Sequence, residues 1–556
     1  MTAANPAPPL PLLAALGAHF DRACDTLAQA CCDGDALDPA ALDREQGAQF
    51  ELAWAKADLD AAAAVMATPG LSHLQQRLAL AFVAEAVPRV ITRLRSVCLD
   101  LGLDDTALHA LAASPDLHAL ARDAASSQAL ASVGRAVFDS PEVLSFPCAD
   151  QDIAMARDAF ERFAVNVVAP LAQKIHEHDL TVPESLLQPM REMGAFGLSI
   201  PEAYGGSATG GARDNALMIA VTEVLSDASL AAAGSLITRP EILARALLAG
   251  GTPQQQAHWL PRIASGELLC AISITEPDYG SDVASLRLAA TPAEGGWRLN
   301  GAKTWCTFAG KAHLLMVVAR THPDLRLGHK GLSVFLVEKP SSEEHAFHCA
   351  SPGGGSLTGR AIPTIGYRGM HSYDLSFDDF FVPAANLIGG EAGQGKGFYF
   401  TMAGMTGGRL QTTGRACGVM RAAIKAAVAQ AQNRKVFGQP LAALALTQIK
   451  MARIAASWLA CRALGEAVAA TPQRKTHSME ASVAKLLACR NAELVTREAL
   501  QIHGAMGYAQ ETPVSRHFVD ARVLSIFEGA EETLALKVIA RSLLDGALNA
   551  RKAVTA

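Results

Sequence analysis

Apolar residues recur at helical spacing through the first quarter of the chain. Residues 46–66 and 73–94 carry apolar side chains three and four positions apart, which is the spacing of one helix face. Polar turns such as CDGDALDP and ATPG separate these stretches, and Ser114 in AASPD is placed as a helix N-cap. The pattern predicts a layer of helices over residues 10–140, with no nucleophile motif, metal-ligand cluster or glycine-rich phosphate loop in it.

The apolar pattern changes twice further along the chain. After a boundary at residues 139–152, residues 152–179 form a long amphipathic pattern and the helical period continues to residue 266. From about Leu268, short β-rich runs such as HLLMVVAR and GLSVFLVEK alternate with Gly, Pro, Asn and Asp, and SPGGGSLTG reads as a flexible loop among them. The period is helical again after NLIGGEAGQGKGF. We therefore expect four domains: a helical extension at residues 1–145, a helical domain at 146–268, a β domain at 269–388 and a C-terminal helical domain at 389–556.

Composition narrows the class of protein. The 556 residues are half hydrophobic and carry a net charge of −6, so neither nucleic acid nor an anionic membrane is an expected partner. No uninterrupted run of 18 apolar residues predicts a membrane span, and the N-terminal stretch MTAANPAPPLPLLAALGAHFDRA lacks the positive region of a signal peptide. The eleven cysteines have no CxxC spacing, which favours reduced thiols in a cytoplasmic protein. We expect no metal site.

Two stretches in the β region carry polar groups suited to a flat cofactor. In ITEPDYGSD, Thr275 and Ser281 sit in a tight loop whose hydroxyl and N–H groups could hold a ring edge or a phosphate, although a purely structural turn looks similar. In NGAKTWCTFAG, Trp305 and Thr307 alternate along a strand and share a face. That face could wall a flat ring or belong to an ordinary core.

Two stretches of the C-terminal region have similar potential. In NRKVFGQPL, Arg434 and Phe437 are three residues apart late in a predicted helix and would be neighbours on one face. Arginine offers a fork to phosphate and phenylalanine offers stacking, but the stretch could also be a helix end capped by Gly438. Further on, Gln501 and Gly504 belong to a predicted turn in LQIHGAMGYAQET.

Glu528 stands out in the stretch LSIFEGAEET. It directly follows an apolar run and directly precedes a glycine. Burial beside apolar side chains raises the pKa of a carboxylate unless a partner compensates. The residue is therefore either a capping or salt-bridging carboxylate at a helix start, or a general base tuned by its surroundings.

Together, in this order and at these separations, the four stretches resemble the acyl-CoA dehydrogenase family over roughly residues 150–545. The resemblance implies a mainly α fold with a central β-barrel domain, in which a helical domain, the β-barrel and a C-terminal four-helix domain clasp FAD and an acyl-CoA thioester. Here an N-terminal helical extension precedes them. The resemblance also implies an FAD-dependent oxidoreductase that introduces a double bond between the α and β carbons of the acyl chain.

By this resemblance Glu528 is the base that removes the α-proton, while the β-hydride goes to flavin N5. We expect its apolar neighbours Ile526 and Phe527 to desolvate it and raise its basicity. The resemblance gives flavin contacts to Thr275, Ser281, Trp305 and Thr307, FAD diphosphate and adenine contacts to Arg434, Phe437, Gln501 and Gly504, and substrate contacts to Ser281 and Arg409. Because FAD in the family commonly touches two subunits, it also implies a homodimer or homotetramer, and it suggests electron-transfer flavoprotein as the electron acceptor.

The sequence departs from the family at two places near the base. Many members carry a threonine after the Glu-Gly step, where this chain has Ala530 followed by Glu531 and Glu532. The usual Arg-Asp pair before the base is Val519-Asp520 here. Both departures concern individual FAD contacts.

The extension of about 140 residues is absent from simple members of the family. Four stretches of this chain are similar to stretches of extended members that oxidise a branched acyl chain ending in a carboxylate. They are FELAWAKADL, SLITRPEI, TIGYRGMHSYDLSF and SIFEGAEE. Such a substrate requires a cation in the acyl pocket, because a buried unpaired carboxylate is costly. Arg239 is the candidate, and the alternative is a surface arginine paired with Glu241 or Asp227.

Two other functions stay open at this point. One is dehydrogenation of a different short branched acyl-CoA, with the extension merely structural. The other is a flavin-containing DNA-damage-response protein of the same fold, which the charge of −6 and the short stretch after the base disfavour.

Overall fold

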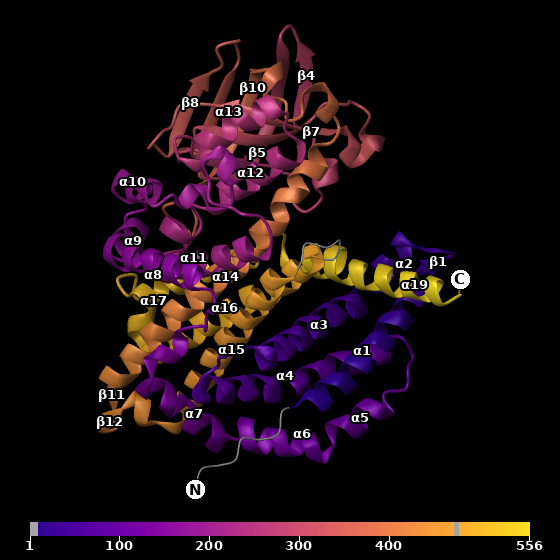
Figure 1. Ribbon diagram of the computed structural model, residues 1–556, viewed down its shortest axis with the longest axis vertical. Coiled ribbons are helices and arrows are strands. Elements are labelled where there is room, and N and C mark those ends of the chain that lie inside the picture. Colours follow the sequence, from indigo (N-terminus) through magenta and orange to yellow (C-terminus); the bar gives the residue numbers. More distant parts are fainter. Residues whose placement is uncertain (1–8, 472–476, 556) are drawn as a thin grey trace. The chain divides into compact units, whose positions relative to one another are not determined.

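The computed structural model describes residues 9–471 and 477–555. The chain forms two compact units, and Figure 1 shows their helices and strands. The bundle unit consists of Met1–Met155 and Thr412–Ala556, and the sheet unit is Ala156–Gln411. The first eight residues of the stretch examined for a signal peptide lie outside the described residues, and a helix, α1, begins at Leu10.

The predicted N-terminal layer of helices is confirmed, and it packs on the C-terminal helices within the bundle unit. Helix α3 lies against α4, and α15 contacts α3, α4 and α7, while α1 lies against α19 (Figure 1). The extension and the C-terminal bundle therefore share one core. The helices that carry this unit are α1 (Leu10–Ala30), α2 (Pro39–Arg44), α3 (Gln46–Ala67), α4 (His73–Asp100), α5 (Thr106–Ala112), α6 (Pro115–Leu120), α7 (Ser127–Asp139), the second half of α14 (Gly397–Asn433), α15 (Ala445–Ala470), α16 (His477–His503), α17 (Pro513–Leu524), α18 (Glu531–Thr533) and α19 (Arg541–Thr555).

Side-chain caps begin several of these helices, α4 and α6 among them. The Ser72 hydroxyl accepts a hydrogen bond from the Gln75 backbone N–H, and the Gln75 side chain accepts one from the Ser72 N–H, which is a capping box at the start of α4. Ser114 caps α6 by accepting from the Leu117 N–H at 3.2 Å. The Ser114 cap predicted from the sequence is confirmed.

In the sheet unit the predicted long helix is interrupted. A π-helical turn (Ala164–Val168) separates α8 from α9, so the amphipathic pattern is continuous but the hydrogen-bond register shifts. The α-helices in this part of the chain are α8 (Gln151–Phe163), α9 (Ala169–Glu177), α10 (Glu184–Glu192), α11 (Ala212–Ala228), α12 (Thr238–Gly250) and α13 (Pro253–Ala264).

Eight strands form one curled sheet in the order β3-β6-β4-β5-β10-β9-β8, with β7 paired to β6. The bounds are β3 (Cys270–Ser273), β4 (Ala289–Ala293), β5 (Gly296–Thr307), β6 (Leu314–Arg320), β7 (Leu332–Glu338), β8 (Ala346–Ala350), β9 (Ser356–Ala361) and β10 (Ser372–Pro383). Strand β6 is buried along its whole length, because alternate residues belong to two different hydrophobic clusters. This explains why HLLMVVAR reads as a continuous apolar run. The predicted fold class, mainly α with a central β domain, is confirmed.

One sequence interpretation in this sheet is wrong. SPGGGSLTG is not a flexible loop, because Ser356–Ala361 is strand β9 and pairs with both β8 and β10. The left-handed residues Gly354 and Gly355, with φ of 96° and 78°, turn the chain back between β8 and β9. Three consecutive glycines concealed the short strand that follows them.

Among the described residues, no helix combines the length and the apolar character needed to cross a membrane.

Lys339 gives the sheet unit a testable pH dependence. Its ammonium group is buried and donates to the carbonyl groups of Gly310, Ala312 and Pro340 at 2.7–2.9 Å, and burial lowers its pKa from 10.5 to about 8. Between these values the unfolded chain binds more protons, so this lysine makes the free energy of unfolding rise with pH. We expect the free energy of unfolding of the wild type, relative to that of Lys339→Met, to rise from about pH 8 to about pH 10 in urea titrations. The exposed Lys330→Met is the control, and a difference that stays constant with pH would contradict the assignment.

Candidate active site

Glu528 lies in the loop between α17 and α18, in a left-handed backbone conformation. Its φ is 55°, which is unusual for a residue with a side chain, and Gly529 follows with φ of 102°. The buried Lys485 of α16 donates to the carbonyl oxygens of Phe527 at 2.7 Å and Gly529 at 2.6 Å, on either side of Glu528. One ammonium group thus holds the backbone of this loop at both flanks of the carboxylate.

The Glu528 carboxylate is hydrogen-bonded on both oxygens. Arg415 donates from Nη2 to Oε1 at 2.7 Å, and the Thr412 hydroxyl donates to Oε2 at 2.6 Å. Arg415 and Thr412 are one turn apart on α14, and the Arg415 side chain is completely buried while that of Glu528 is 10% exposed. The guanidinium also lies over the Phe527 ring, 4.7 Å from its centre. The buried cation of Arg415 and the hydroxyl donor of Thr412 favour the charged form of this carboxylate, which is the form that accepts a proton.

The expected apolar surroundings of Glu528 are therefore wrong in detail. Ile526 is 54% exposed and points away from the buried core, and Phe527 carries the arginine on its ring. Of the two interpretations left open by the sequence, the salt bridge exists. It does not exclude the base, because an ion pair keeps the carboxylate charged and oriented.

Sequence reasoning missed Arg415, Thr412 and Lys485. Their partners lie far away along the chain: Arg415 and Glu528 are 113 positions apart, and Lys485 and Phe527 are 42 positions apart. The available signal was a charged residue inside an otherwise small or apolar helical segment, in GRACG and VAKLLAC. A charge is rarely buried there unless it has a specific partner.

In the sheet unit, Thr275 sits in a loop fixed by a buried ion pair. The Glu276 carboxylate accepts from the backbone N–H groups of Arg287 at 2.7 Å and Leu288 at 2.8 Å. Lys303 donates to Glu276 at 2.8 Å and to the carbonyl group just before Thr275 at 2.7 Å. Burial lowers the pKa of Lys303 to about 8, although Glu276 opposes that shift. The half-buried Thr275 is held by neighbours that sequence reasoning did not single out, and the exposed Ser281 lies in the same loop.

Trp305 and Thr307 both face outward near the end of β5, with Cys306 buried between them. The register against β10 shifts at this point, and Trp305 adopts a φ of 55°. The indole is 55% exposed, and the Thr307 hydroxyl shares a 2.9 Å hydrogen bond with that of Ser372. The shared face predicted from alternation is present, and the bulge presents a large aromatic ring to the outside of the sheet.

The helical placement of Arg434 and Phe437 is wrong. Helix α14 ends at Asn433, and the next residues form a small hairpin of β11 (Lys435–Val436) and β12 (Gln439–Pro440). Phe437 and Gly438 occupy the turn with φ of 49° and 81°, and two successive left-handed residues cannot continue a helix. Phe437 is 95% exposed at the tip of this hairpin.

Gln501 and Gly504 lie at the end of α16 in the bundle unit. Gln501 is exposed in the last turn, and Gly504 takes a φ of 62° where the helix gives way to a 3-10 turn (Gly504–Tyr508). The predicted turn is present from Gly504 onward, whereas the prediction is wrong for Gln501, which belongs to the helix.

Two arginines proposed for the substrate are buried in the sheet unit. Arg239 donates to the Ser235 carbonyl at 2.7 Å and to the Tyr367 hydroxyl at 3.2 Å. Glu241 pairs instead with Arg245 at 2.7 Å, so the alternative of a surface arginine bound to Glu241 is wrong. Arg409 is buried on α14.

A separate cluster of possible ligands was not expected from the sequence. The ligand atoms of Asp179, His345 and His371 all lie within 4.8 Å of one another. His371 is hydrogen-bonded to Asp179 at 3.1 Å, its ring centre lies 4.5 Å from that of His345 at a tilt of 46°, and Arg368 approaches the same carboxylate at 3.7 Å. These contacts account for the gathering of the side chains.

Comparison with known proteins identifies the family of the chain. Models of the acyl-CoA dehydrogenase N-terminal, middle and C-terminal domains match residues 150–267, 271–380 and 395–544. A (2S)-methylsuccinyl-CoA dehydrogenase of Cereibacter sphaeroides is 36% identical, over 95% of this chain and 96% of that protein. An acyl-CoA dehydrogenase of Bacillus subtilis is 34% identical over 71% of this chain and 99% of its own length. The structure of butyryl-CoA dehydrogenase from Megasphaera elsdenii superposes with a TM-score of 0.63 at 27% identity, covering 72% of this chain and all of that one. The chain belongs to the acyl-CoA dehydrogenase family of oxidoreductases.

Proposed function

We propose that this enzyme is an FAD-dependent dehydrogenase that oxidises (2S)-methylsuccinyl-CoA to mesaconyl-CoA, a step of the ethylmalonyl-CoA pathway. The Cereibacter relative matches the chain along 95% of its length and so includes the extension, whereas the Bacillus enzyme matches only 71%. All eleven cysteines are free, which agrees with the cytoplasmic location that we also propose.

The observation that carries the substrate proposal is the buried Arg239. A methylsuccinyl chain ends in a carboxylate, and removing that charge from water requires a cation. Arg239 is 7% exposed, and its guanidinium group donates hydrogen bonds to two neutral oxygens. A planar guanidinium group whose partners are neutral is suited to bind a carboxylate through both its charge and its N–H donors.

The residues assigned to FAD have the character that this cofactor requires. Trp305 and Phe437 are large aromatic side chains left 55% and 95% exposed, and each is suited to covering a flat ring. The hydroxyls of Thr275, Ser281 and Thr307 would bind polar edges of the flavin, and Arg434, Gln501 and Gly504 would bind the diphosphate and adenine part. When bound, FAD supplies the acceptor for the β-hydride.

The chain's own contribution to the reaction centres on Glu528. Its carboxylate, kept charged by Arg415 and Thr412, takes the proton from the carbon next to the thioester carbonyl. The left-handed backbone at Glu528 is held by Lys485, so the direction of the carboxylate is set before substrate arrives. Ser281 and Arg409 would bind parts of the acyl-CoA.

The proposal includes an assembly and a redox partner. The exposed Phe437, together with Arg434 three residues earlier, would contact the FAD of a neighbouring subunit. Such a contact requires a homodimer or a homotetramer. Electron-transfer flavoprotein is the proposed electron acceptor.

Anaerobic bleaching of the flavin tests the function. The purified protein is titrated with (2S)-methylsuccinyl-CoA, butyryl-CoA and isovaleryl-CoA, and we expect rapid bleaching by the first alone. Bleaching by an uncharged acyl chain instead would keep the dehydrogenase and reject the carboxylated substrate.

Arg239→Ala gives a sharper test of the pocket. Loss of the cation is expected to raise the KM for methylsuccinyl-CoA by about 30-fold or more, because a charge-assisted contact contributes roughly 2 kcal/mol or more to substrate binding. Arg245→Ala is the matched control, because Arg245 lies on the same helix but already pairs with Glu241. Equal losses on butyryl-CoA and methylsuccinyl-CoA would show a general defect rather than carboxylate recognition.

A further inference from the structure

We propose that the N-terminal extension positions the Glu528 loop through Trp54 and Arg490. This inference rests on the proposed role of Glu528 as the base, and it assigns a task to a part of the chain that simple members of the family lack. Trp54 is thus a positioning residue that acts through other side chains.

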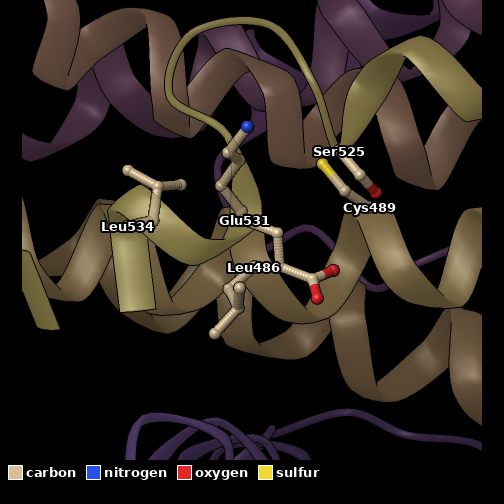
Figure 2. Close-up of a pocket in the computed structure, with 6 residues that line it drawn as sticks. Leu486, Cys489, Ser525, Glu531 and Leu534 are labelled. Carbon is tan, nitrogen blue, oxygen red and sulfur yellow. The ribbon is translucent and has the colours of Figure 1, made fainter. Parts of the chain in front are cut away.

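The loop is closed by its own two ends. The Glu531 backbone N–H donates to the Ser525 carbonyl at 3.2 Å, which draws the segment around Glu528 into a compact turn. The Ser525 hydroxyl donates to Glu493 of α16. Figure 2 shows Ser525 beside Cys489 and Glu531 beside Leu486, so both ends of the loop rest against α16.

Arg490 ties the second end to that helix. It donates to the Glu531 carboxylate from Nε at 3.1 Å and also from Nη2. A two-point contact of this kind fixes direction as well as distance. Arg490 lies five residues after Lys485, so one helix holds both the backbone and the downstream end of the loop.

The extension supplies the surface on which Arg490 rests. The guanidinium lies over the Trp54 ring, 4.5 Å from its centre, and the indole is 3% exposed on α3. Arg93 of α4 approaches the same ring at 5.5 Å and bonds Glu51 at 2.7 Å, so the indole is held from the extension side. Trp54 therefore restricts the positions that the Arg490 side chain can take. Because Arg490 binds Glu531, the same contact also restricts the positions of the loop.

The sequence departure after the Glu-Gly step lies next to this arrangement. Glu531 directly follows Ala530, which stands where many family members carry a threonine, and it meets an arginine that is supported by a tryptophan of the extension. The three residues form one continuous set of contacts from α3 to the loop.

The test uses the full-length protein loaded with FAD and two readouts of the base. The first is the rate of flavin reduction under saturating methylsuccinyl-CoA. The second is exchange of the α-proton with D₂O in a 3-thia-acyl-CoA, which can lose that proton but has no β-hydride to give. Trp54→Leu should lower both rates about tenfold with little change in KM or FAD content, and Trp54→Phe should restore them to within about twofold.

Arg453→Ala is the matched control for the extension. Arg453 on α15 pairs with Glu85 of α4 at 2.7 Å, so this variant weakens the contact between extension and bundle without touching the Glu528 loop. Its rates should equal those of the wild type. If Trp54→Leu does not fold, Glu531→Gln breaks the same contacts from the loop end and should show the same tenfold loss in both readouts.

The outcomes separate this inference from the proposed function. Wild-type rates in the variants of Trp54 and Glu531, or an equal loss in Arg453→Ala, would overturn the positioning role. A wild-type protein that fails to bleach with methylsuccinyl-CoA but does so with butyryl-CoA would reject the substrate, and the comparison of variants would proceed on butyryl-CoA.

Discussion

Replacing Glu528 by glutamine is expected to lower the rate of flavin reduction by acyl-CoA on the order of 10⁴-fold, at the upper end of what a positioned base contributes. The amide keeps the size of the side chain and can still accept from Thr412, but it cannot take the α-proton. Stopped-flow reduction of the flavin under anaerobic conditions measures the loss. The FAD content of the purified variant should equal that of the wild type.

The matched control is Glu532→Gln, which removes the same charge from an exposed carboxylate four residues further on. It should reduce the flavin at the wild-type rate. Turnover of Glu528→Gln near that rate would reject Glu528 as the base and leave its pair with Arg415 a structural feature.

The sequence predicts much of the fold because the spacing of apolar residues and the residues that begin or end an element are local properties. The apolar runs of β6 and β7 and the alternation in β5 identify the sheet, and Ser114 marks a helix start through a contact only three residues away. Each of these elements can be recognised without knowing its neighbours in space.

Errors arise where backbone conformation overrides pattern. Phe437 lies three residues after Arg434, which is a helical spacing. Its backbone is nevertheless left-handed, and with Gly438 it forms the turn of a hairpin. Trp305 also departs from regular strand geometry at a register shift. Non-glycine residues in this conformation are uncommon, so a prediction from propensity places Phe437 in a helix and does not show the bulge at Trp305, although the strand itself is predicted correctly.

The environment of Glu528 could not be predicted for a different reason. Ile526 and Phe527 suggest an apolar pocket, but the side chains that contact the carboxylate come from α14. A buried charge pair depends on two segments meeting, and neither segment alone records it. The chemistry at Glu528 could be assigned from the family resemblance, whereas its electrostatics required the fold.

Arg415→Met is the second change with a large expected effect, because it leaves the Glu528 carboxylate largely buried without its cation. Loss of one partner of a buried pair typically costs about 3–5 kcal/mol, and we expect a decrease near the lower end in the free energy of unfolding. Removal of the cation also favours the protonated carboxyl, so the pH at which flavin reduction is half-maximal should rise. Urea titrations and a pH series of reduction rates measure the two effects.

A double-mutant cycle separates the pair from general damage to the bundle. Once Glu528 is glutamine, Arg415 is a buried cation without its anion, so adding Arg415→Met should then cost little or even stabilise the protein. Arg462→Met is the control, because it breaks another buried arginine's pair, with Glu466 at 2.7 Å, and should lower stability without moving the pH profile. Additive losses in the cycle, or an unchanged pH profile in Arg415→Met, would mean that Arg415 supports the helices and not the charge of the base. A strong coupling with a shifted profile would mean that the ion pair seen here is what keeps Glu528 ready to accept a proton.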